Sequence, residues 1–570
     1  MKRAFTRILL MLLCCAMVLS TMAATVGAAE KIDTSKIRDV YIPTTGIVNA
    51  PTVVQNVNTA EKLRNLQDAV RPQAAWLDLS SDGSVKLGDK TATLQEALQA
   101  CDGKVIPILQ IPDMDCADFV IETVKDNYFD LLFASSDITI LKKLHDEAIT
   151  HTRLVLISDE QDPQKLVETA LPNGVMIVAQ TKSTRDICEY LQQRFLSVMV
   201  MPNLENDEQD VRYSVDCGAD FVVMDNFQTA YDMYASVTET TMVRRGYVIG
   251  HRGAPHYAPD NTVEGLRYAF LEGADAVEID IWRTTDDRLI CFHNNNLKGS
   301  TIEPLDDPEK PIIEYSYEEL QQYTLIYKGT LTNSNQCKIP TLDDMLKAMQ
   351  DYPSQMLVIE LKDYQECADL IKPLLEKYDV ADQCVFISFG PNYLRAQHVV
   401  NSTLGASMLD GINLEGDVLG HLERYYGFTV GYPASYSPAY YITAEAIRQL
   451  HCRGINVNLW TAGNFTTMTE FAQKGAMFVT TDAAEDEAHV RALYDDMSAK
   501  TVFKNYNVQP TPPTTQPTTT QPSTQPTTNV GQAASTNSFM SNIVPWFFIL
   551  PAVAFVIAIF AKIYNVRKKA

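Results

Sequence analysis

The stretch CGADFVVMD at residues 217–225 recurs as KGAMFVTTD at residues 474–482. In each copy an apolar stretch that we predict to be a strand is followed by an aspartate. Shorter matches run in the same order along both halves: 58–61 with 261–264, 93–98 with 341–346, and 116–118 with 367–369. These matches predict one duplicated α/β unit. Two unrelated α/β domains with chance matches are the alternative.

Short apolar strands alternate with helical stretches through both halves, which predicts parallel strands joined by crossover helices. The first half offers eight strands: Val40–Ile42, Ala75–Leu79, Val105–Leu109, Leu131–Ala134, Leu154–Ile157, Val175–Ala179, Val198–Met201 and Phe221–Met224. The second half also offers eight: Tyr247–Gly250, Ala276–Ile281, Met356–Leu361, Cys384–Phe389, Gly405–Leu409, Phe428–Tyr432, Ile455–Leu459 and Met477–Thr481, with Leu289–Phe292 as an extra strand. Eight such units in about 250 residues are typical of a closed barrel. We therefore expect an α/β fold with two TIM-type (β/α)8 barrels in tandem, at 30–244 and 245–505.

Both ends of the chain differ in composition from these barrels. A basic start, an apolar run and small residues predict a signal peptide at 1–29, with a retained signal anchor as the alternative. A Pro/Thr-rich linker at 506–542 precedes a predicted transmembrane helix at 543–563 and a basic tail at 564–570. Because basic residues favour the cytoplasmic side, we expect a single-pass protein of the cell membrane with both barrels outside the cytoplasm.

Charge and cysteine content narrow the range of partners. The 570-residue chain has a formal net charge of -24. This acidic balance argues against a nucleic-acid partner, and it means that any phosphate site must be built locally. Nine cysteines follow Glu30, without regular spacing. We therefore expect buried thiols and no disulfide framework.

Reactive side chains of the second half cluster where strands end. Glu278 and Asp280 are two residues apart, so both side chains point to one face of a strand, and Glu360 and Lys362 repeat this geometry. His251, Arg252 and His293 also follow strands. All of them fall at the carboxyl ends of strands, the face on which barrels of this type carry their active sites.

Three carboxylates in one barrel mouth repel one another unless a cation lies between them. Oxygen ligands suit a hard divalent ion, either Mg²⁺ or Ca²⁺. A cation with an arginine and a lysine suits a phosphate diester, and two histidines can act as general acid and base. Structural alternatives exist: a salt-bridged mouth, Trp460 as a barrel plug, and Asn261 with Glu264 as a helix capping box.

Taken in order, the segments HRG at 251–253, PDNT at 259–262, EID at 278–280, His293 and ELK at 360–362 resemble the glycerophosphodiester phosphodiesterase family. The resemblance covers the second barrel. It implies metal-dependent hydrolysis of a small phosphodiester or lipid head group to glycerol 3-phosphate and an alcohol. It also implies site roles: His251 and His293 as the acid–base pair, Glu278, Asp280 and Glu360 as metal ligands, Arg252 and Lys362 as phosphate contacts, and Trp460 in the pocket wall.

Three places depart from the family pattern: Asn294 replaces an aspartate, Asp260 replaces a glutamate, and Gly299-Ser300-Thr301 stands where the family has Arg-Thr-Thr. The first half departs further, with no histidine before His145. When the halves are aligned on Cys116 and Cys367, an apolar Leu109 falls opposite Glu360. The same alignment places Ile111 opposite Lys362. We therefore expect a non-catalytic first barrel with an apolar mouth.

Two other functions stay open at this point. One is phospholipase D-like action on lysolipids, because the linker would keep the barrels near a bilayer. The other is a surface binding protein in which both barrels are inert, suggested by Asn294 and by the missing chemistry of the first half. Release of glycerol 3-phosphate, measured with and without a chelator, distinguishes these alternatives from the leading hypothesis.

Overall fold

The structure is a computed structural model that describes residues 37–506, except 125–129, 148–152, 328–336, 363–366, 413, 415, 429–434, 440, 485–489, 492–493 and 495–496. The predicted signal peptide (1–29), transmembrane helix (543–563) and basic tail (564–570) lie outside these residues, as does the linker (506–542) apart from Tyr506. Among the described helices, none is both long enough and apolar enough to cross a bilayer.

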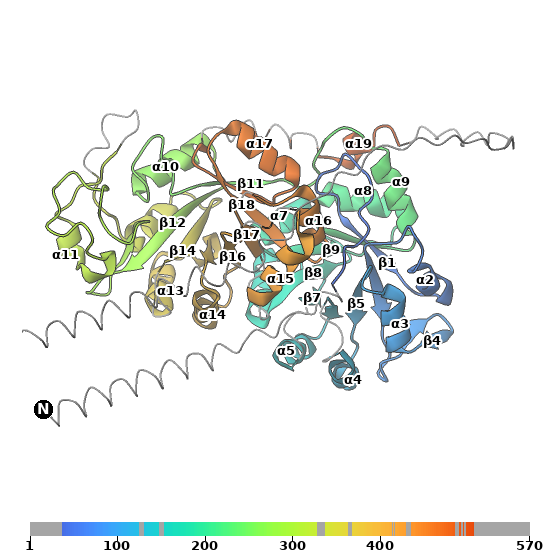
Figure 1. Ribbon diagram of the computed structural model, residues 1–570. Coiled ribbons are helices and arrows are strands. Elements are labelled where there is room, and N and C mark those ends of the chain that lie inside the picture. Colours follow the sequence, from blue (N-terminus) through green and yellow to red (C-terminus); the bar gives the residue numbers. More distant parts are fainter. Residues whose placement is uncertain are drawn as a thin grey trace, which may run out of the picture. The chain divides into compact units, whose positions relative to one another are not determined.

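The first half of the chain forms a closed barrel of eight parallel strands (Figure 1). The strands pair in chain order and β10 returns to β1, with the hairpin β3–β4 inserted after β2. The strands are β1 (Thr52–Asn56), β2 (Ala74–Asp78), β3 (Val85–Leu87), β4 (Lys90–Ala92), β5 (Ile106–Gln110), β6 (Leu132–Ser135), β7 (Arg153–Ile157), β8 (Val175–Gln180), β9 (Ser197–Val200) and β10 (Phe221–Met224).

The second half forms another barrel of eight parallel strands, closed by the pairing of β11 with β12. The extra strand, β13, pairs antiparallel with β12 outside the barrel order, as the sequence predicts. The strands are β11 (Tyr247–Gly250), β12 (Ala276–Arg283), β13 (Leu289–Cys291), β14 (Met356–Leu361), β15 (Cys384–Ser388), β16 (Ala406–Asp410), β17 (Ser435–Pro438), β18 (Asn456–Ala462) and β19 (Phe478–Thr481). The prediction of two tandem TIM-type barrels is confirmed.

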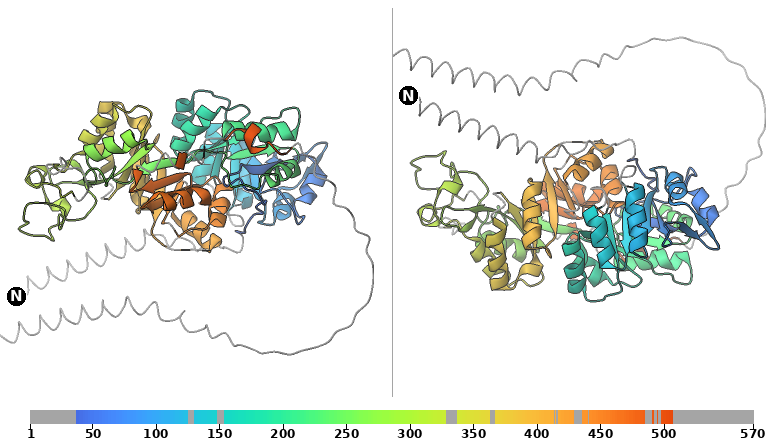
Figure 2. Two further views of the ribbon diagram at one scale, coloured as in Figure 1. Left: turned by 90° about the horizontal axis from the view of Figure 1, so that it is seen from above. Right: turned by 90° about the horizontal axis from the view of Figure 1, so that it is seen from below.

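Helices surround the strands of each barrel (Figure 2). Around the first barrel they are α2 (Ala60–Asn65), α3 (Leu94–Cys101), α4 (Met114–Val124), α5 (Ile138–Glu147), α6 (Pro163–Ala170), α7 (Arg185–Gln193), α8 (Asp207–Cys217) and α9 (Phe227–Ala235). The second half contributes α10 (Val263–Glu272), α11 (Tyr317–Leu320), α12 (Leu342–Met349), α13 (Cys367–Tyr378), α14 (Pro391–Val400), α15 (Val418–Phe428), α16 (Ala444–His451), α17 (Phe465–Lys474) and α19 (Ala499–Val502). The repeated threonines Thr93 and Thr341 begin α3 and α12 with capping boxes, which satisfy otherwise unpaired backbone N–H groups.

One strand prediction is wrong. Val40–Ile42 is not a strand, because the backbone of Val40 exchanges hydrogen bonds with the side chain of Gln449 in the second barrel. Of the strand predicted at Phe428–Tyr432, Phe428 ends helix α15, and residues 429–432 lie outside the described residues; the next described strand is β17. A short apolar run has the same composition at a helix end and in a buried strand, so periodicity does not separate the two.

The mouth of the first barrel differs from its prediction. Leu109 and Ile111 pack into the layer between strands and helices, whereas Gln110 lines the mouth. Register explains the difference: Asp78 pairs with Gln110 just as Asp280 pairs with Glu360. Gln110 is six positions before Cys116, whereas Glu360 is seven before Cys367. An alignment on the two cysteines is therefore wrong by one residue along this strand, and such a shift exchanges the residues of its two faces.

The amino-terminal ends of the strands form the contact between the barrels. The ring of Phe195, next to β9, lies 5.0 Å from that of Phe478 at the start of β19. Ser197 Oγ donates to the Gly454 carbonyl at 3.2 Å, and Asn456 Nδ2 donates to the Phe195 carbonyl at 3.1 Å. One continuous apolar cluster contains side chains from both barrels. Each carboxyl-end mouth therefore lies at the end of its barrel away from this contact.

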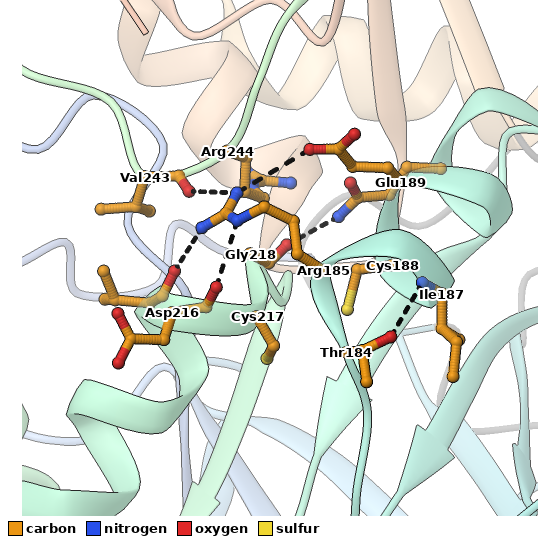
Figure 3. A network of polar contacts seen from close by, with 12 residues as sticks. Thr184, Arg185, Ile187, Cys188, Glu189, Asp216, Cys217, Gly218, Val243 and Arg244 are labelled. Carbon is orange, nitrogen blue, oxygen red and sulfur yellow. Dashed lines mark hydrogen bonds and ion pairs between the residues drawn. The ribbon is translucent and has the colours of Figure 1, made fainter. Parts of the chain in front are cut away.

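Arginines hold the connection between the barrels in place. Arg185 donates to the carbonyls of Val215 at 2.9 Å and Asp216 at 3.1 Å, at the end of α8, and to that of Val243 at 3.5 Å (Figure 3). Arg244, which follows Val243 in the chain, forms a buried ion pair with Asp220. The nine described cysteines are all free, as expected, and eight of them are buried.

Candidate active site

The first loop of the second barrel brings a histidine and an arginine into the mouth. Strand β11 ends at Gly250, and His251 and Arg252 follow it directly. Arg252 has a φ of 56°, in the left-handed region, and its backbone N–H donates to Glu278 Oε2 at 3.0 Å. This hydrogen bond ties the loop to the neighbouring strand.

Three carboxylates from two adjacent strands converge beside this loop. Glu278 and Asp280 lie on β12, and Glu360 lies opposite Asp280 on β14. All three are buried, and one oxygen of each lies within 4.8 Å of the others. Lys362 Nζ contacts Asp280 at 3.0 Å and Glu360 at 2.6 Å. The alternation of strand residues thus places every member of the group on one face.

The electrostatics of this carboxylate group favour a cation. Burial, together with the charge of Asp280, raises the pKa of Glu360 to about 7. Burial and both neighbouring carboxylates also raise the pKa of Glu278. Glu278 Oε1 is buried without a hydrogen-bond partner. An unsatisfied buried oxygen in an all-oxygen donor set fits a hard divalent ion, which would favour the ionised carboxylates.

The two histidines have different partners. His251 Nδ1 lies 2.6 Å from Asp482 Oδ1, a residue that follows β19. His293 Nδ1 lies 3.0 Å from Asn294 Oδ1, at the position where the family pattern has aspartate. Burial lowers the pKa of His293. The Nδ1 atom of His251 therefore has a carboxylate partner, and that of His293 has a neutral amide partner.

Asn261 supports the carboxylates and does not cap a helix as the sequence suggests. Its φ is 59°, and Thr262 is the N-cap of α10. Asn261 Nδ2 donates to Asp280 Oδ2, and Asn261 Oδ1 accepts from the Asp280 backbone N–H, both at 2.8 Å. Sequence reasoning assigned no role to Asp482, although its place after the last barrel strand is a signal for a mouth residue.

Two cavities meet at Arg252 and His293. The smaller, of about 170 Å³, also contains His251, Glu278, Glu360, Lys362 and Trp460. Trp460 Nε1 donates to the Ser437 carbonyl at 2.9 Å, and its ring packs edge-on against Phe389 at 5.8 Å. The larger cavity, of about 520 Å³, extends past Asn294 to His256 and Tyr327. Seven of the eight predicted site residues line the smaller cavity, and the eighth, Asp280, contacts the lining residue Lys362.

A model of the glycerophosphoryl diester phosphodiesterase family matches residues 251–486. The second barrel belongs to this family. It is the phosphodiesterase domain of the chain, and its boundaries enclose every site residue predicted above.

Relatives of this phosphodiesterase domain are distant in sequence. A glycerophosphodiester phosphodiesterase of Bacillus altitudinis is 27% identical over 155 residues, which cover 26% of this chain and 61% of that protein. One from Caldanaerobacter subterraneus is 22% identical over 245 residues, or 42% of this chain and 94% of that protein. The solved structure of an Oleispira antarctica phosphodiesterase with the product sn-glycerol-3-phosphate is 21% identical, with a TM-score of 0.37, over 44% of this chain and 97% of that one.

Proposed function

We propose that the protein hydrolyses glycerophosphodiesters to glycerol 3-phosphate and an alcohol in a metal-dependent reaction. The observation that carries the proposal is the convergence of three buried carboxylates, an arginine, a lysine and two histidines in one barrel mouth. The named substrate of the relatives and the product bound to the Oleispira antarctica enzyme support this substrate class.

Glu278, Asp280 and Glu360 would hold the metal, either Mg²⁺ or Ca²⁺. When bound, such an ion supplies Lewis-acid polarisation of a phosphoryl oxygen. Arg252 and Lys362 would contact the phosphate, since both cations border the cavity that contains the carboxylates. Lys362 is also the counter-charge that keeps Asp280 and Glu360 together.

His251 would accept the proton of the attacking hydroxyl. Asp482, at 2.6 Å, orients its ring and stabilises the imidazolium that forms. His293 borders both cavities, so it is placed to donate a proton to the leaving alcohol. The smaller cavity, closed by Trp460, would hold the glycerol side, and the larger cavity would accept alcohols of varied size.

The location is part of the same proposal. A signal peptide at 1–29 and a transmembrane helix at 543–563 would display both barrels at the outer face of the membrane, on the linker at 506–542. External protease should then release a soluble active fragment by cutting that linker, because exposed spacers are where nicking concentrates. Protection of the barrels in intact cells would contradict this orientation.

The test of the activity uses the full-length protein in detergent with glycerophosphocholine, and it measures the release of glycerol 3-phosphate. Chelation should abolish turnover, and Mg²⁺ or Ca²⁺ should restore it. His251→Ala and His293→Ala should each lower kcat by about 10²-fold or more, and Glu360→Gln should raise the metal concentration required for half-maximal rate. His145→Ala, on the partly exposed surface of α5, is the control. Full turnover in excess chelator would refute the metal-dependent mechanism.

A lysolipid is the second candidate substrate, favoured by apolar residues near the larger cavity. Ile326 lines this cavity and is 36% exposed, and Ile302 and Ile313 on the same segment are also exposed. An acyl chain would cover such residues. Parallel assays with glycerophosphocholine and lysophosphatidylcholine decide between the substrates through the ratio of their kcat/KM values.

A further inference from the structure

The mouths of the two barrels correspond residue by residue. Because Asp78 pairs with Gln110 and Asp280 pairs with Glu360, Asp78 occupies the position of Asp280 and Gln110 that of Glu360. Two residues earlier on the same strand face, Trp76 occupies the position of Glu278. The first barrel thus keeps one of three carboxylates.

The histidine position corresponds as well. The pairings of β1 with β2 and β10 place Asn56 where the second barrel has His251, and Asp225 follows β10 as Asp482 follows β19. Asn56 Nδ2 donates to Asp225 Oδ1 at 3.2 Å, the same connection that His251 makes to Asp482. The hydrogen-bonding framework is retained, and the group able to transfer a proton near neutral pH is replaced by an amide.

Metal and phosphate binding are lost together in the first mouth. Trp76 Nε1 donates to Asp78 Oδ1 at 2.8 Å and to Gln110 Oε1 at 3.1 Å, so an indole N–H occupies the acceptors that a cation would need. Pro112 stands two residues after Gln110, where the second barrel has Lys362. The described cavity lining contains no lysine or arginine, and nearby Lys62 contacts Asp225 at 3.0 Å. A phosphate diester would meet carboxylates and neutral amides there, with no cationic side chain in the described lining.

The cavity itself persists, with a volume of about 570 Å³. Its polar lining combines carboxylates, which accept hydrogen bonds, with amides, which both donate and accept. Apolar side chains complete the wall: Ile157, Met201 and Val223. One polar member, Asp210, is only 5% exposed, so part of the lining is already desolvated. Such a wall matches a ligand that has hydroxyl groups on its edges and C–H groups on its faces.

We propose that the mouth of the first barrel is a binding site for a neutral carbohydrate. Sugar hydroxyls would donate to Asp78, Asp207 and Asp225 and accept from the amides of Asn56 and Asn203, all of which line the cavity. The apolar side chains would cover a C–H face of the sugar ring. The site is separate from the phosphodiesterase mouth, because each mouth lies away from the contact between the barrels. It would hold the enzyme on a glycan while the second barrel acts.

The test is binding of the full-length protein in detergent to an array of neutral oligosaccharides, followed by calorimetric titration of the strongest hit. Glycerol phosphate and choline are the charged probes. Met201→Trp, which fills the cavity, should abolish carbohydrate binding, and Asp78→Asn should weaken it by about tenfold or more, the effect of removing a charged acceptor. Neither variant should change hydrolysis of glycerophosphocholine. Val399→Trp, an exposed site on α14, is the matched control and should leave binding unchanged.

Each result decides the proposal. A neutral glycan whose binding depends on Met201 and Asp78, with normal turnover, supports it. Absence of binding to every neutral glycan overturns it, as does glycan binding that Met201→Trp and Asp78→Asn leave intact. Binding of glycerol phosphate in this cavity would show a retained phosphate site, and binding of choline alone would show a cation site; either result also overturns it. If Met201→Trp lowers the melting temperature, the milder Asp78→Asn variant decides.

Discussion

Loss of Asp130 should destabilise the protein strongly, because this residue neutralises a buried arginine at the contact between the barrels. Its carboxylate oxygens lie 3.1 and 3.0 Å from Arg453 Nε and 2.9 Å from Nη2, and Tyr426 Oη donates to it at 2.8 Å. Arg453 is 0% exposed. Asp130→Ala leaves this guanidinium buried without its counter-charge, which costs about 3–5 kcal/mol.

Urea unfolding followed by tryptophan fluorescence measures this loss in free energy of unfolding. Asp118→Ala is the control, because the ion pair of Asp118 with Lys143, at 2.9 Å, is exposed, and such pairs contribute about 1 kcal/mol or less. Turnover at low temperature should stay within about twofold of wild type in both variants, since the active site lies at the other end of its barrel from the substituted residue. A loss below about 1 kcal/mol in Asp130→Ala would refute a desolvated contact between the barrels.

Three further predictions concern single side chains. Asp482→Asn removes the carboxylate 2.6 Å from His251, so kcat should fall by about 10²-fold or more in steady-state assays; an unchanged kcat would exclude an orienting role. Trp460→Ala opens the smaller cavity, so KM for glycerophosphocholine should rise by about tenfold with a smaller change in kcat; an unchanged KM would place the glycerol elsewhere. Burial, with His145 nearby, lowers the pKa of His398 from 6.5 to about 4, so the folded protein binds fewer protons than the unfolded chain between these values. The contribution of His398 to the free energy of unfolding should be fully present above pH 6.5 and fall by about 3 kcal/mol as the pH drops to 4. The stability of the wild type relative to His398→Gln should therefore fall by that amount over this range in chemical denaturation.

Prediction from the sequence succeeded where local patterns are strong. Alternating strands and helices specified both barrels, since each unit must bury one apolar face against a shared core. The spacing of Glu278, Asp280 and Glu360 placed three carboxylates in one mouth, since strand side chains alternate between faces. The prediction of a strand at Val40–Ile42 failed, because a short apolar run carries no period that separates a strand from a packed loop.

Only the tertiary structure showed the contacts between side chains that are far apart in the sequence. The pairing of His251 with Asp482 spans the closure of the barrel, and the contact of Asp130 with Arg453 joins two barrels.

The sequence by itself determined the fold of two tandem barrels, the family of the second barrel and the absence of a histidine before His145 in the first. Only the tertiary structure decided that Gln110, and not Leu109, lines the first mouth. The physical reason lies in the loop between this strand and the aligned cysteine, which differs in length by one residue between the barrels. Aligning the two halves on that cysteine without a gap therefore shifts the strand by one residue, whereas the hydrogen bonds between neighbouring strands set its true register. That register replaces the apolar mouth expected from the sequence with a polar cavity beside Trp76.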